Sequence, residues 1–417
     1  PILKQYLEQL LNSLASHSQL EDPRLELVIV NNPTINAFAV PGGIVGVHTG
    51  IFIHAKTEDE LSSILAHELA HLSQRHFARG IEAQRQNSLL SMGGLLAGLA
   101  IAAAAGADAG TAAMTVSQAA AMEGSLRYSR SNEQEADRIG LQTMKAANRN
   151  PRAAAEMFET MLSITRHSIN RPPEFLLTHP VTEKRISDAR NRTMNTSLRH
   201  YPPSEEYLLM QSRAITALNK DPDTVIKNFR LKLRQRVLNS DAINYGLTLA
   251  HLKKNDLVKA KQLIDVLIEN NPNQLIFRHT DIEIDMASKR LQLAAAKLDT
   301  LLEKNPNNYP LLLLQSDLHL ARKKYHQSIE LLNLLTRDRP EDPDIWYRVA
   351  EVSGLAGDIA GVHKARAEYF ILVGAFDRAR KQLSRAAILL KNDFKESAMI
   401  RQRLRDLTII EDRVVKL

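Results

Sequence analysis

The sequence predicts a mainly helical protein that combines a small α+β domain with an array of helical hairpins. Two observations lead to this prediction. The string HELAH at 67–71 lies in a predicted helix that follows short β-rich runs. After residue 204, helical runs come in pairs and prolines recur at a regular spacing. We therefore place a first domain at 1–200 and a second, repetitive domain at 201–417.

The first domain is expected to begin with a helix over 3–14 and to continue with short strands. Runs of β-forming residues, separated by turn signals, predict strands at 25–30, 37–40 and 44–47. Residues 57–78 predict one long helix, with Thr57 as its N-cap and acidic residues in its first turn. Further helices are expected over 132–147, over 151–166 and from Thr182, with a loop at 170–180.

Residues 86–122 form a segment rich in Ala, Gly, Leu and Met. Within it, 89–107 contain Ser91 as the one polar residue, and that length could span a bilayer. Because much of the run is Ala and Gly and no basic flank follows it, we favour a mobile flap over the neighbouring site. A membrane-proximal hairpin and a true membrane span are the alternatives.

The second domain shows a repeat of 34 residues. Asn271-Pro272, Asn305-Pro306 and Arg339-Pro340 each follow a helical run. Small residues recur at one phase of this period, at Ala260, Ala294 and Ser328. This period, with two helices and a terminal proline in each unit, is typical of tetratricopeptide repeats. We expect five or six units, stacked into a superhelix with a concave binding face.

The composition supports globular domains and excludes several kinds of site. Of the 417 residues, 44% are hydrophobic and 24% are charged, so each domain can bury a core. The absence of cysteine excludes disulfides, a cysteine nucleophile and thiolate metal ligands. The net charge of +7 comes from interleaved basic and acidic residues, so we expect no nucleic-acid partner. Because the chain starts at Pro1 rather than Met, we expect a mature or trimmed product.

The HELAH string predicts a zinc peptidase site. Residues four apart share one face of a helix, so His67 and His71 can bind one Zn²⁺. Glu68 lies beside the first histidine and can act as general base toward a water on the metal. The expected cofactor is one Zn²⁺ per chain, and the expected activity is that of a zinc metalloendopeptidase.

A third ligand must come from elsewhere in the chain, and residues 131–137 (SNEQEAD) supply the candidates. Glu133 is our preferred ligand, and Asp137, one turn on, can hydrogen-bond a ligand imidazole. Glu135 points roughly to the opposite side of the helix and is the alternative ligand. A solvated acidic helix face is the remaining interpretation.

Taken together, these motifs resemble a known family. HELAH, then NEQEAD at 132–137 and THPVTEKR at 178–185, with NAFAVPGGIVGVHTG at 36–50 upstream, are similar to the zinc metalloproteases that include the CAAX prenyl proteases and the stress protease HtpX. The resemblance implies a thermolysin-like α+β core, Glu133 as third ligand, and a strand at 36–50 along which substrate peptide lies. It also implies that His179, Pro180 and Arg185 lie near the zinc and help to stabilise the reacting carbonyl.

Members of this family with a C-terminal tetratricopeptide array form a soluble, exported branch, and the resemblance to them covers nearly the whole chain. It implies a location in the periplasm of a Gram-negative bacterium, soluble or peripherally associated with the outer membrane. It implies a chaperone-like role in quality control and assembly of outer-membrane β-barrel proteins. Misfolded or stalled barrel proteins would be the substrates, and the barrel-assembly machinery would be a partner of the repeat domain.

Two questions stay open at the level of sequence. His179 is expected to be a fourth metal ligand in a resting state, a donor to the transition state together with Arg185, or a structural residue. The whole protein could also act mainly as a tetratricopeptide chaperone or adaptor whose protease site is largely latent. A membrane-integral prenyl-protein protease is a third interpretation, and it would require stable membrane spans.

Overall fold

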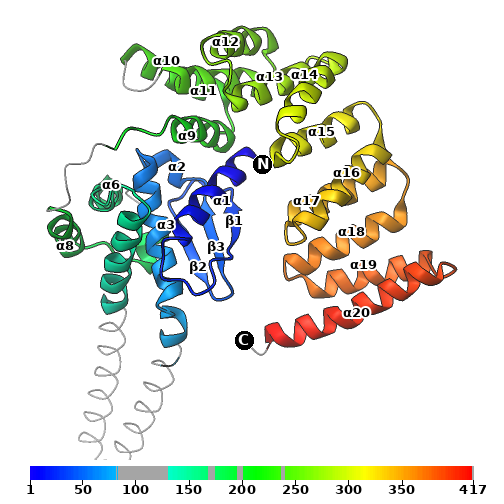
Figure 1. Cartoon of the computed structure of the whole chain (residues 1–417), viewed down its shortest axis with the longest axis horizontal. Helices are drawn as coiled ribbons and strands as arrows, with labels where there is room; N and C mark the ends of the chain where they lie inside the picture. The colour runs from blue at the N-terminus through cyan, green and yellow to red at the C-terminus, as the bar shows by residue number, and fades with distance from the viewer. Residues whose placement is uncertain (81, 83–129, 168–173, 195–200, 236–239, 416–417) are drawn as a thin grey trace, which may run out of the picture. The chain divides into compact units, whose positions relative to one another are not determined.

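The computed structural model describes residues 1–80, 82, 130–167, 174–194, 201–235 and 240–415 (Figure 1). The contacts between residues divide the chain into two compact units, residues 2–263 and residues 264–417. We call these the N-terminal unit and the C-terminal unit. The segment 86–122, for which a flap or hairpin is expected, lies outside the described residues.

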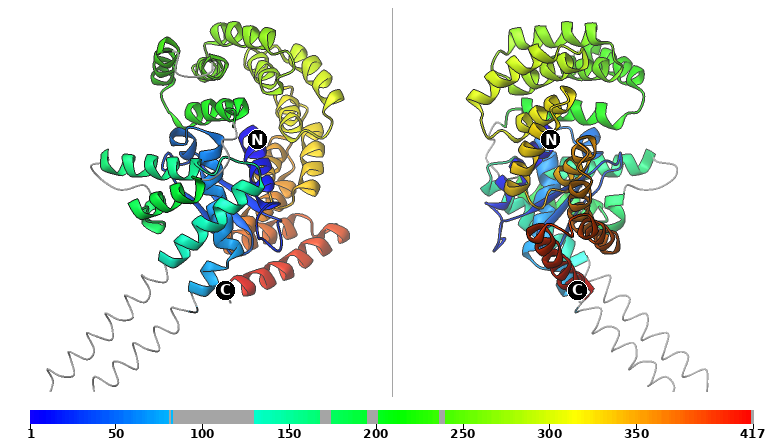
Figure 2. Two further views of the ribbon diagram at one scale, coloured as in Figure 1. Left: turned by 60° about the vertical axis from the view of Figure 1, so that its left-hand side comes forward. Right: turned by 90° about the vertical axis from the view of Figure 1, so that its right-hand side faces the viewer.

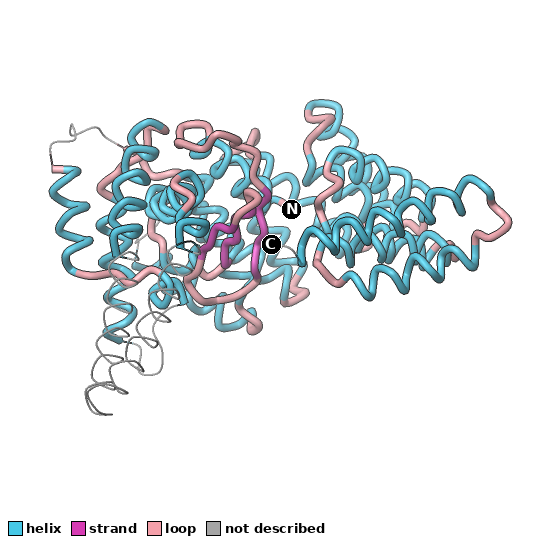
Figure 3. Tube along the Cα trace, turned by 90° about the horizontal axis from the view of Figure 1, so that it is seen from below, coloured by secondary structure: helices cyan, strands magenta, loops and turns pink. Residues whose placement is uncertain are grey.

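The N-terminal unit contains a sheet of three strands, drawn in magenta in Figure 3, with the order β1-β3-β2. The strands are β1 (Glu26–Val30), β2 (Ala37–Val40) and β3 (Ile44–His48), close to their predicted positions. β3 pairs in parallel with β1 and antiparallel with β2, so β2 lies at an edge of the sheet. Phe38 faces Gly46 across the antiparallel pair, and a Cβ at position 46 would come within 2.2 Å of its ring. The ring can therefore lie across the sheet only because residue 46 is glycine.

The first helices of the chain are α1 (Ile2–Ala15), α2 (Ile51–His54) and α3 (Glu58–Ser73). α3 is the central one, because each residue from Glu60 to Ala70 is buried. Thr57 caps it as predicted, since its side chain accepts a hydrogen bond from the Glu60 amide at 3.1 Å. The Glu60 carboxylate reaches back and accepts from the Lys56 amide at 2.6 Å. These two bonds fix where the helix begins, and with it the register of HELAH.

The prediction of one continuous helix over 57–78 is wrong at its end. α3 ends at Ser73, and Arg75 adopts a φ of 53°. A residue in this left-handed region ends a helix, because it turns the backbone out of the helical path. Helical structure resumes over 76–80 after this turn.

The other helices of the first domain are one over 130–146, α6 (Ala153–His167), α7 (Glu174–Thr178) and α8 (Glu183–Thr193). α7 lies in the segment 170–180, which was predicted to be a loop. This helix has five residues, too few to show a helical repeat of apolar residues in the sequence. The 130–146 helix packs closely on α3 at Gly140. A Cβ at that position would lie 3.2 Å from the His67 backbone nitrogen and 3.3 Å from the Ala66 carbonyl.

The next four helices belong by their contacts to the same N-terminal unit. They are α9 (Glu205–Leu218), α10 (Pro222–Gln235), α11 (Ser240–Lys253) and α12 (Leu257–Asn270), and the unit ends within the last of them. The hydroxyl of Tyr207 on α9 donates to the Ala55 carbonyl at 2.7 Å, and its ring stacks on Phe52 of α2 with centroids 5.7 Å apart. The first helical hairpin is thus anchored on the end of α2.

The C-terminal unit consists of helical hairpins, which Figure 2 shows following one another as antiparallel neighbours. The helices are α13 (Leu275–Ala287), α14 (Leu291–Lys304), α15 (Tyr309–Ala321), α16 (Tyr325–Asp338), α17 (Pro343–Leu355), α18 (Ile359–Leu372), α19 (Phe376–Leu389) and α20 (Phe394–Val415). Ala294 and Ser328, the small residues at the predicted phase, are fully buried, as is Ala260 in α12. The mainly helical fold with a three-stranded sheet and a repeat array is confirmed. Within the described part of the chain, no helix combines the length and apolar character needed to cross a bilayer.

Candidate metal centre and active site

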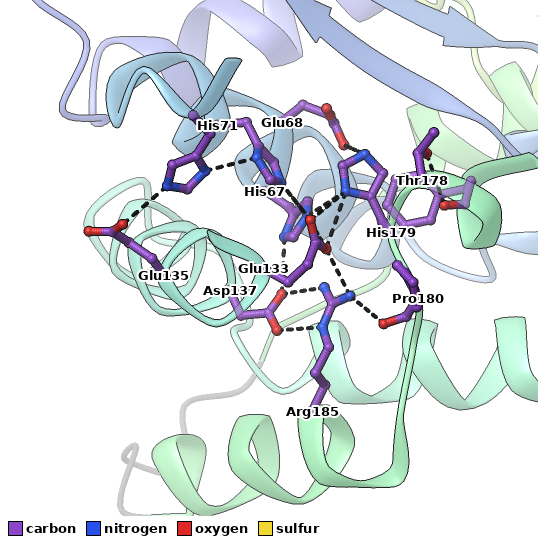
Figure 4. Close-up of polar contacts among 12 residues, drawn as sticks. His67, Glu68, His71, Glu133, Glu135, Asp137, Thr178, His179, Pro180 and Arg185 are labelled. Atoms are coloured by element: carbon purple, nitrogen blue, oxygen red, sulfur yellow. Dashed lines mark hydrogen bonds and ion pairs between the residues drawn. The ribbon is translucent and has the colours of Figure 1, made fainter. Parts of the chain in front are cut away.

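Three elements bring together four side chains that can bind a metal. His67 and His71 project from α3, Glu133 from the 130–146 helix and His179 from the end of α7 (Figure 4). One ligand atom from each lies within 4.8 Å of the others. The four positions are separated by up to 112 residues in the chain, so only the fold assembles them.

The distances within this cluster fit a tetrahedral metal site. The Nε2 atoms of His67 and His71 are 2.9 Å apart, and each lies 3.4 Å from an oxygen of Glu133. His179 Nδ1 lies 3.4 Å from His67 Nε2 and 3.0 Å from Glu133 Oε1. Ligands placed about 2.0–2.1 Å from a zinc ion in a tetrahedron are about 3.3 Å apart. Two or three imidazoles and one carboxylate are also the donors that zinc commonly takes.

The electrostatics of the cluster favour a positive charge at its centre. Burial disfavours the charged form of His67, but hydrogen bonds with Asp137 and Glu133 outweigh it and raise its pKa to about 9. Burial lowers the pKa of His71 to about 3. Burial would raise the pKa of Glu133, yet its hydrogen bonds with His179, His67 and His71 hold it far below the ordinary value. The carboxylates therefore favour a proton on the His67 ring when no metal is bound, and a divalent cation would take the place of that positive charge.

Glu68 is 1% exposed, and its Oε1 accepts no hydrogen bond among the described residues. His179 Nε2 is 3.6 Å from that oxygen (Figure 4). Burial raises the pKa of the Glu68 carboxyl above its ordinary value. A buried carboxylate with an unused oxygen is suited to taking a proton from a group that enters the site.

Asp137 and Arg185 form a layer behind the ligands. Asp137 Oδ1 is 3.0 Å from Nδ1 of His67, which is the contact expected from the sequence. The Arg185 guanidinium binds both oxygens of Asp137 at 2.7 Å and Glu133 Oε2 at 2.9 Å. It also donates to the Pro180 carbonyl at 2.9 Å, and Figure 4 shows it between these partners. Arg185 is 5% exposed and is absent from the walls of the cleft described next, so its charge acts on the ligands.

An open cleft of about 810 Å³ leads to the cluster. Its walls include Phe38 and Ala39 of the edge strand β2, Glu68 and His71 of α3, and His179. A larger groove of about 1200 Å³ lies between α6 and α8, but it contains none of the candidate metal ligands. The cleft beside β2 is therefore the place where a substrate can meet the cluster.

Two contacts beside the cluster were not predicted from the sequence. Phe175 stacks on the His179 ring with centroids 4.7 Å apart, and the His179 amide donates to the Phe175 carbonyl at 2.8 Å. His76 Nδ1 is 2.9 Å from Nδ1 of His71, and its Nε2 is 3.1 Å from Glu135 Oε2. Glu135, the alternative ligand, thus contacts His76 and lies outside the cluster. His76 is five positions after His71, a spacing that places two residues on different faces of a continuous helix. The turn at Arg75 therefore explains their contact.

Comparisons with known proteins agree with this geometry. Residues 1–193 match peptidase family M48, and residues 285–351 match a tetratricopeptide-repeat family. The beta-barrel assembly-enhancing protease of Yersinia pestis is 31% identical over 419 residues, which cover 100% of this chain and 85% of that protein. The protein of the same name from Escherichia coli K12 is 30% identical over 414 residues, covering 99% of this chain and 84% of its own length.

Another relative is similar over less than half of this chain. Mitochondrial metalloendopeptidase OMA1 of Schizosaccharomyces pombe is 34% identical over 181 residues, which cover 43% of this chain and 50% of the relative. The similarity to the bacterial proteins therefore extends over both the metal centre and the repeats. Residues 1–193 match the family, relatives align along the whole chain and the fold assembles a candidate His/Glu metal centre, so the chain belongs to the metalloendopeptidases of peptidase family M48, as a member with a C-terminal tetratricopeptide array.

Proposed function

We propose that the chain is a zinc-dependent endopeptidase in which His67, His71 and Glu133 hold the ion and Glu68 is the general base. The observation that carries this proposal is the cluster of these ligands at tetrahedral spacing, with the buried Glu68 carboxylate beside it. Bound zinc would polarise the scissile carbonyl and make a water molecule more acidic. Asp137 would orient His67 through its Nδ1, and Arg185 would hold Asp137 and Glu133 in place.

The edge strand β2 gives a substrate a place to bind. Among the described residues β2 pairs with β3 on one side, and Ala39 of β2 contributes a backbone hydrogen bond to Glu68. An extended peptide that adds to this edge would run along the cleft, next to Glu68. Glu68 would take the proton of the attacking water and pass it to the leaving amine.

His179 has the position of a gate in this proposal. Its Nδ1 lies among the metal ligands, while its Nε2 faces Glu68 at 3.6 Å. In the resting protein it would occupy the place that water needs, so a substrate or partner must displace it. Once displaced, it could donate to the oxyanion, as could a shifted Arg185.

The experiment is to measure bound zinc together with casein cleavage for the wild type, Glu68→Gln and His179→Ala. We expect one zinc per chain in the wild type and Glu68→Gln, no cleavage by Glu68→Gln, and faster basal cleavage by His179→Ala. Absence of zinc from the wild type would overturn the metal site. Unchanged or slower cleavage by His179→Ala would overturn the gate but leave the zinc site standing.

We further propose that the protein acts in the periplasm on outer-membrane β-barrel proteins, cleaving those that stall and aiding assembly of others. Support comes from the names of the full-length relatives and from the repeats matched at 285–351. In this proposal residues 1–200 form the protease domain, and residues 201–417 form the repeat domain that recruits substrates or the barrel-assembly machinery, with possible peripheral contact at the membrane.

The repeat array also supports a second candidate function, a chaperone or adaptor with a largely latent protease site. Glu68→Gln separates the two roles, because it should remove cleavage without touching the repeats. Assembly of a barrel protein by the Glu68→Gln variant would indicate the chaperone role. Failure of assembly in that variant, with zinc still bound, would show that cleavage itself is required.

A further inference from the structure

The ring nitrogen of His71 that points away from the candidate metal is also bound. His71 Nδ1 lies 2.9 Å from Nδ1 of His76, and the two rings meet edge to face at 76°. His76 is 5% exposed. Its other nitrogen, Nε2, is 3.1 Å from Glu135 Oε2, and that oxygen also accepts from Arg79 at 3.0 Å. A row of polar groups therefore runs from the metal ligand to the protein surface.

The chemistry of the cluster determines where the protons lie in this row. A ring nitrogen that binds a metal carries no proton, so a neutral His71 that binds through Nε2 carries its proton on Nδ1. The contact with His76 then requires that His76 Nδ1 accept this proton in a hydrogen bond. His76 must in turn carry its own proton on Nε2 and donate it to Glu135. One carboxylate thereby sets the tautomers of both histidines.

The two histidine ligands are thus supported in different ways. Asp137 contacts His67 Nδ1 directly, whereas Glu135 reaches His71 through His76. Glu133, Glu135 and Asp137 all lie on the 130–146 helix. This one helix therefore supplies a metal ligand and a carboxylate support for each of the two imidazoles. The left-handed turn at Arg75 is what returns His76 to the row.

We propose that His76 and Glu135 are positioning residues that fix the tautomer and ring orientation of His71 and so strengthen metal binding. The inference rests on the proposed metal site. Groups that hydrogen-bond a metal-ligating histidine commonly contribute a factor of about 10–100 to metal affinity. His76 contacts the cluster through the outward-facing nitrogen of His71, so its effect must act through that ligand.

The test measures the zinc dissociation constant of the metal-free full-length protein by competition with a chromophoric chelator. His76→Leu removes the acceptor, and we expect zinc binding to weaken by about 10–100-fold. His76→Asn places an amide oxygen near the position of Nδ1, and we expect it to recover most of the loss. Glu135→Ala should weaken binding as well, whereas Gln134→Ala, an exposed neighbour on the same helix, should leave it unchanged.

Thermal unfolding of each metal-free variant separates a positioning role from loss of structure. If His76→Leu fails to fold, Glu135→Ala decides the question, because the Glu135 side chain is 27% exposed and its removal leaves the core intact. Wild-type affinity in His76→Leu, or a loss in His76→Asn as large as in His76→Leu, would overturn this inference while the zinc site stands. Absence of zinc binding by the wild type would overturn the proposed function and this inference with it.

Discussion

Asp137 and Arg185 illustrate how single residues stabilise the site from behind. Both side chains are buried, and the guanidinium binds both carboxylate oxygens at 2.7 Å. Burial opposes ionisation of Asp137, but hydrogen bonds with His67 and Arg185 lower its pKa below the ordinary value. The charges of this layer are thus matched, and the removal of one leaves another buried charge with less compensation.

We expect Asp137→Asn to destabilise the metal-free N-terminal unit by about 3–5 kcal/mol at neutral pH, because Arg185 then keeps a buried charge with less compensation. The folded-state pKa of Asp137 is lowered, so its contribution is complete above the unfolded pKa of about 3.9 and is lost as the pH falls through the lower folded value. The difference between wild type and variant should therefore shrink below about pH 4.

Urea unfolding of both proteins at several pH values measures this difference. The double variant Asp137→Asn/Arg185→Gln is the control, because it removes both charges, and it should be more stable than Asp137→Asn alone. A wild-type advantage that stays constant down to the lowest pH would contradict the assignment of the effect to Asp137 ionisation.

At the scale of elements, the spacing between α3 and the 130–146 helix decides where Glu133 lies relative to His67. Gly140 is a point of close approach, where an added Cβ would meet backbone atoms of Ala66 and His67 at 3.2–3.3 Å. Backbone cannot move aside as a flexible side chain can, so the helices must separate by a few tenths of an ångström. The ligand from one helix would then lie farther from the two ligands on the other.

We expect Gly140→Ala to weaken zinc binding, because metal sites tolerate ligand displacements of only about 0.2 Å. Chelator competition measures the affinity. Gly80→Ala is the matched control, since nothing lies within 4 Å of a Cβ at that glycine. Equal zinc affinity in Gly140→Ala and Gly80→Ala would show that the two helices can adjust without cost to the site.

The contact of α9 with α2 is a second element-scale feature with a measurable consequence. Tyr207→Phe keeps the stacking on Phe52 but loses the hydrogen bond to Ala55, so a loss of about 1–3 kcal/mol is expected for the buried carbonyl left behind. Gln211 also donates to that carbonyl, at 2.9 Å, which favours the lower end of this range. Tyr207→Ala removes the ring as well and should cost about 3–5 kcal/mol.

The stability of both variants is measured by chemical unfolding. Circular dichroism and the loss of cleavage activity are recorded at each denaturant concentration. If the contact of α9 stabilises the first domain, each variant should lose cleavage activity and helical signal at the same denaturant concentration, and that concentration should be lower than in the wild type. If Tyr207→Ala unfolded as the wild type does, the contact would add nothing to the stability of the N-terminal unit.

At the scale of the whole molecule, the division into residues 2–263 and 264–417 predicts two unfolding transitions. All candidate metal ligands lie in the N-terminal unit. A ligand that binds only the folded state stabilises it by about 4 kcal/mol at a thousandfold excess over its dissociation constant. Removal of zinc with a chelator should therefore lower the melting temperature of one transition and leave the other unchanged.

Scanning calorimetry with and without chelator tests this expectation. His67→Ala provides the control, because its transitions should not respond to the chelator. A chelator-induced shift of both transitions by the same amount would indicate that the two units unfold as one cooperative body.

Local sequence patterns were enough to predict the helix that carries His67 and His71 and to predict the repeat pattern. Local rules sufficed for these: residues four apart share a helix face, Thr57 caps a helix, and a 34-residue period with buried small residues predicts stacked hairpins. Each strand end lies within one residue of its predicted position, because the turns are marked by Pro and Gly. Glu133 and Asp137 could be named because their spacing places both on one face of one helix.

The contacts between groups that are distant in the chain depend on how the elements pack. A φ of 53° at Arg75 turns His76 back to His71, and no spacing rule for a continuous helix predicts that contact. The closeness of Gly140 to His67, the Phe175 ring on His179 and the Arg185 bonds to two carboxylates likewise depend on packing between elements. Such contacts join residues far apart in the chain, and the physical reason they escape prediction is that sequence periodicity reports the face of an element but not its partner.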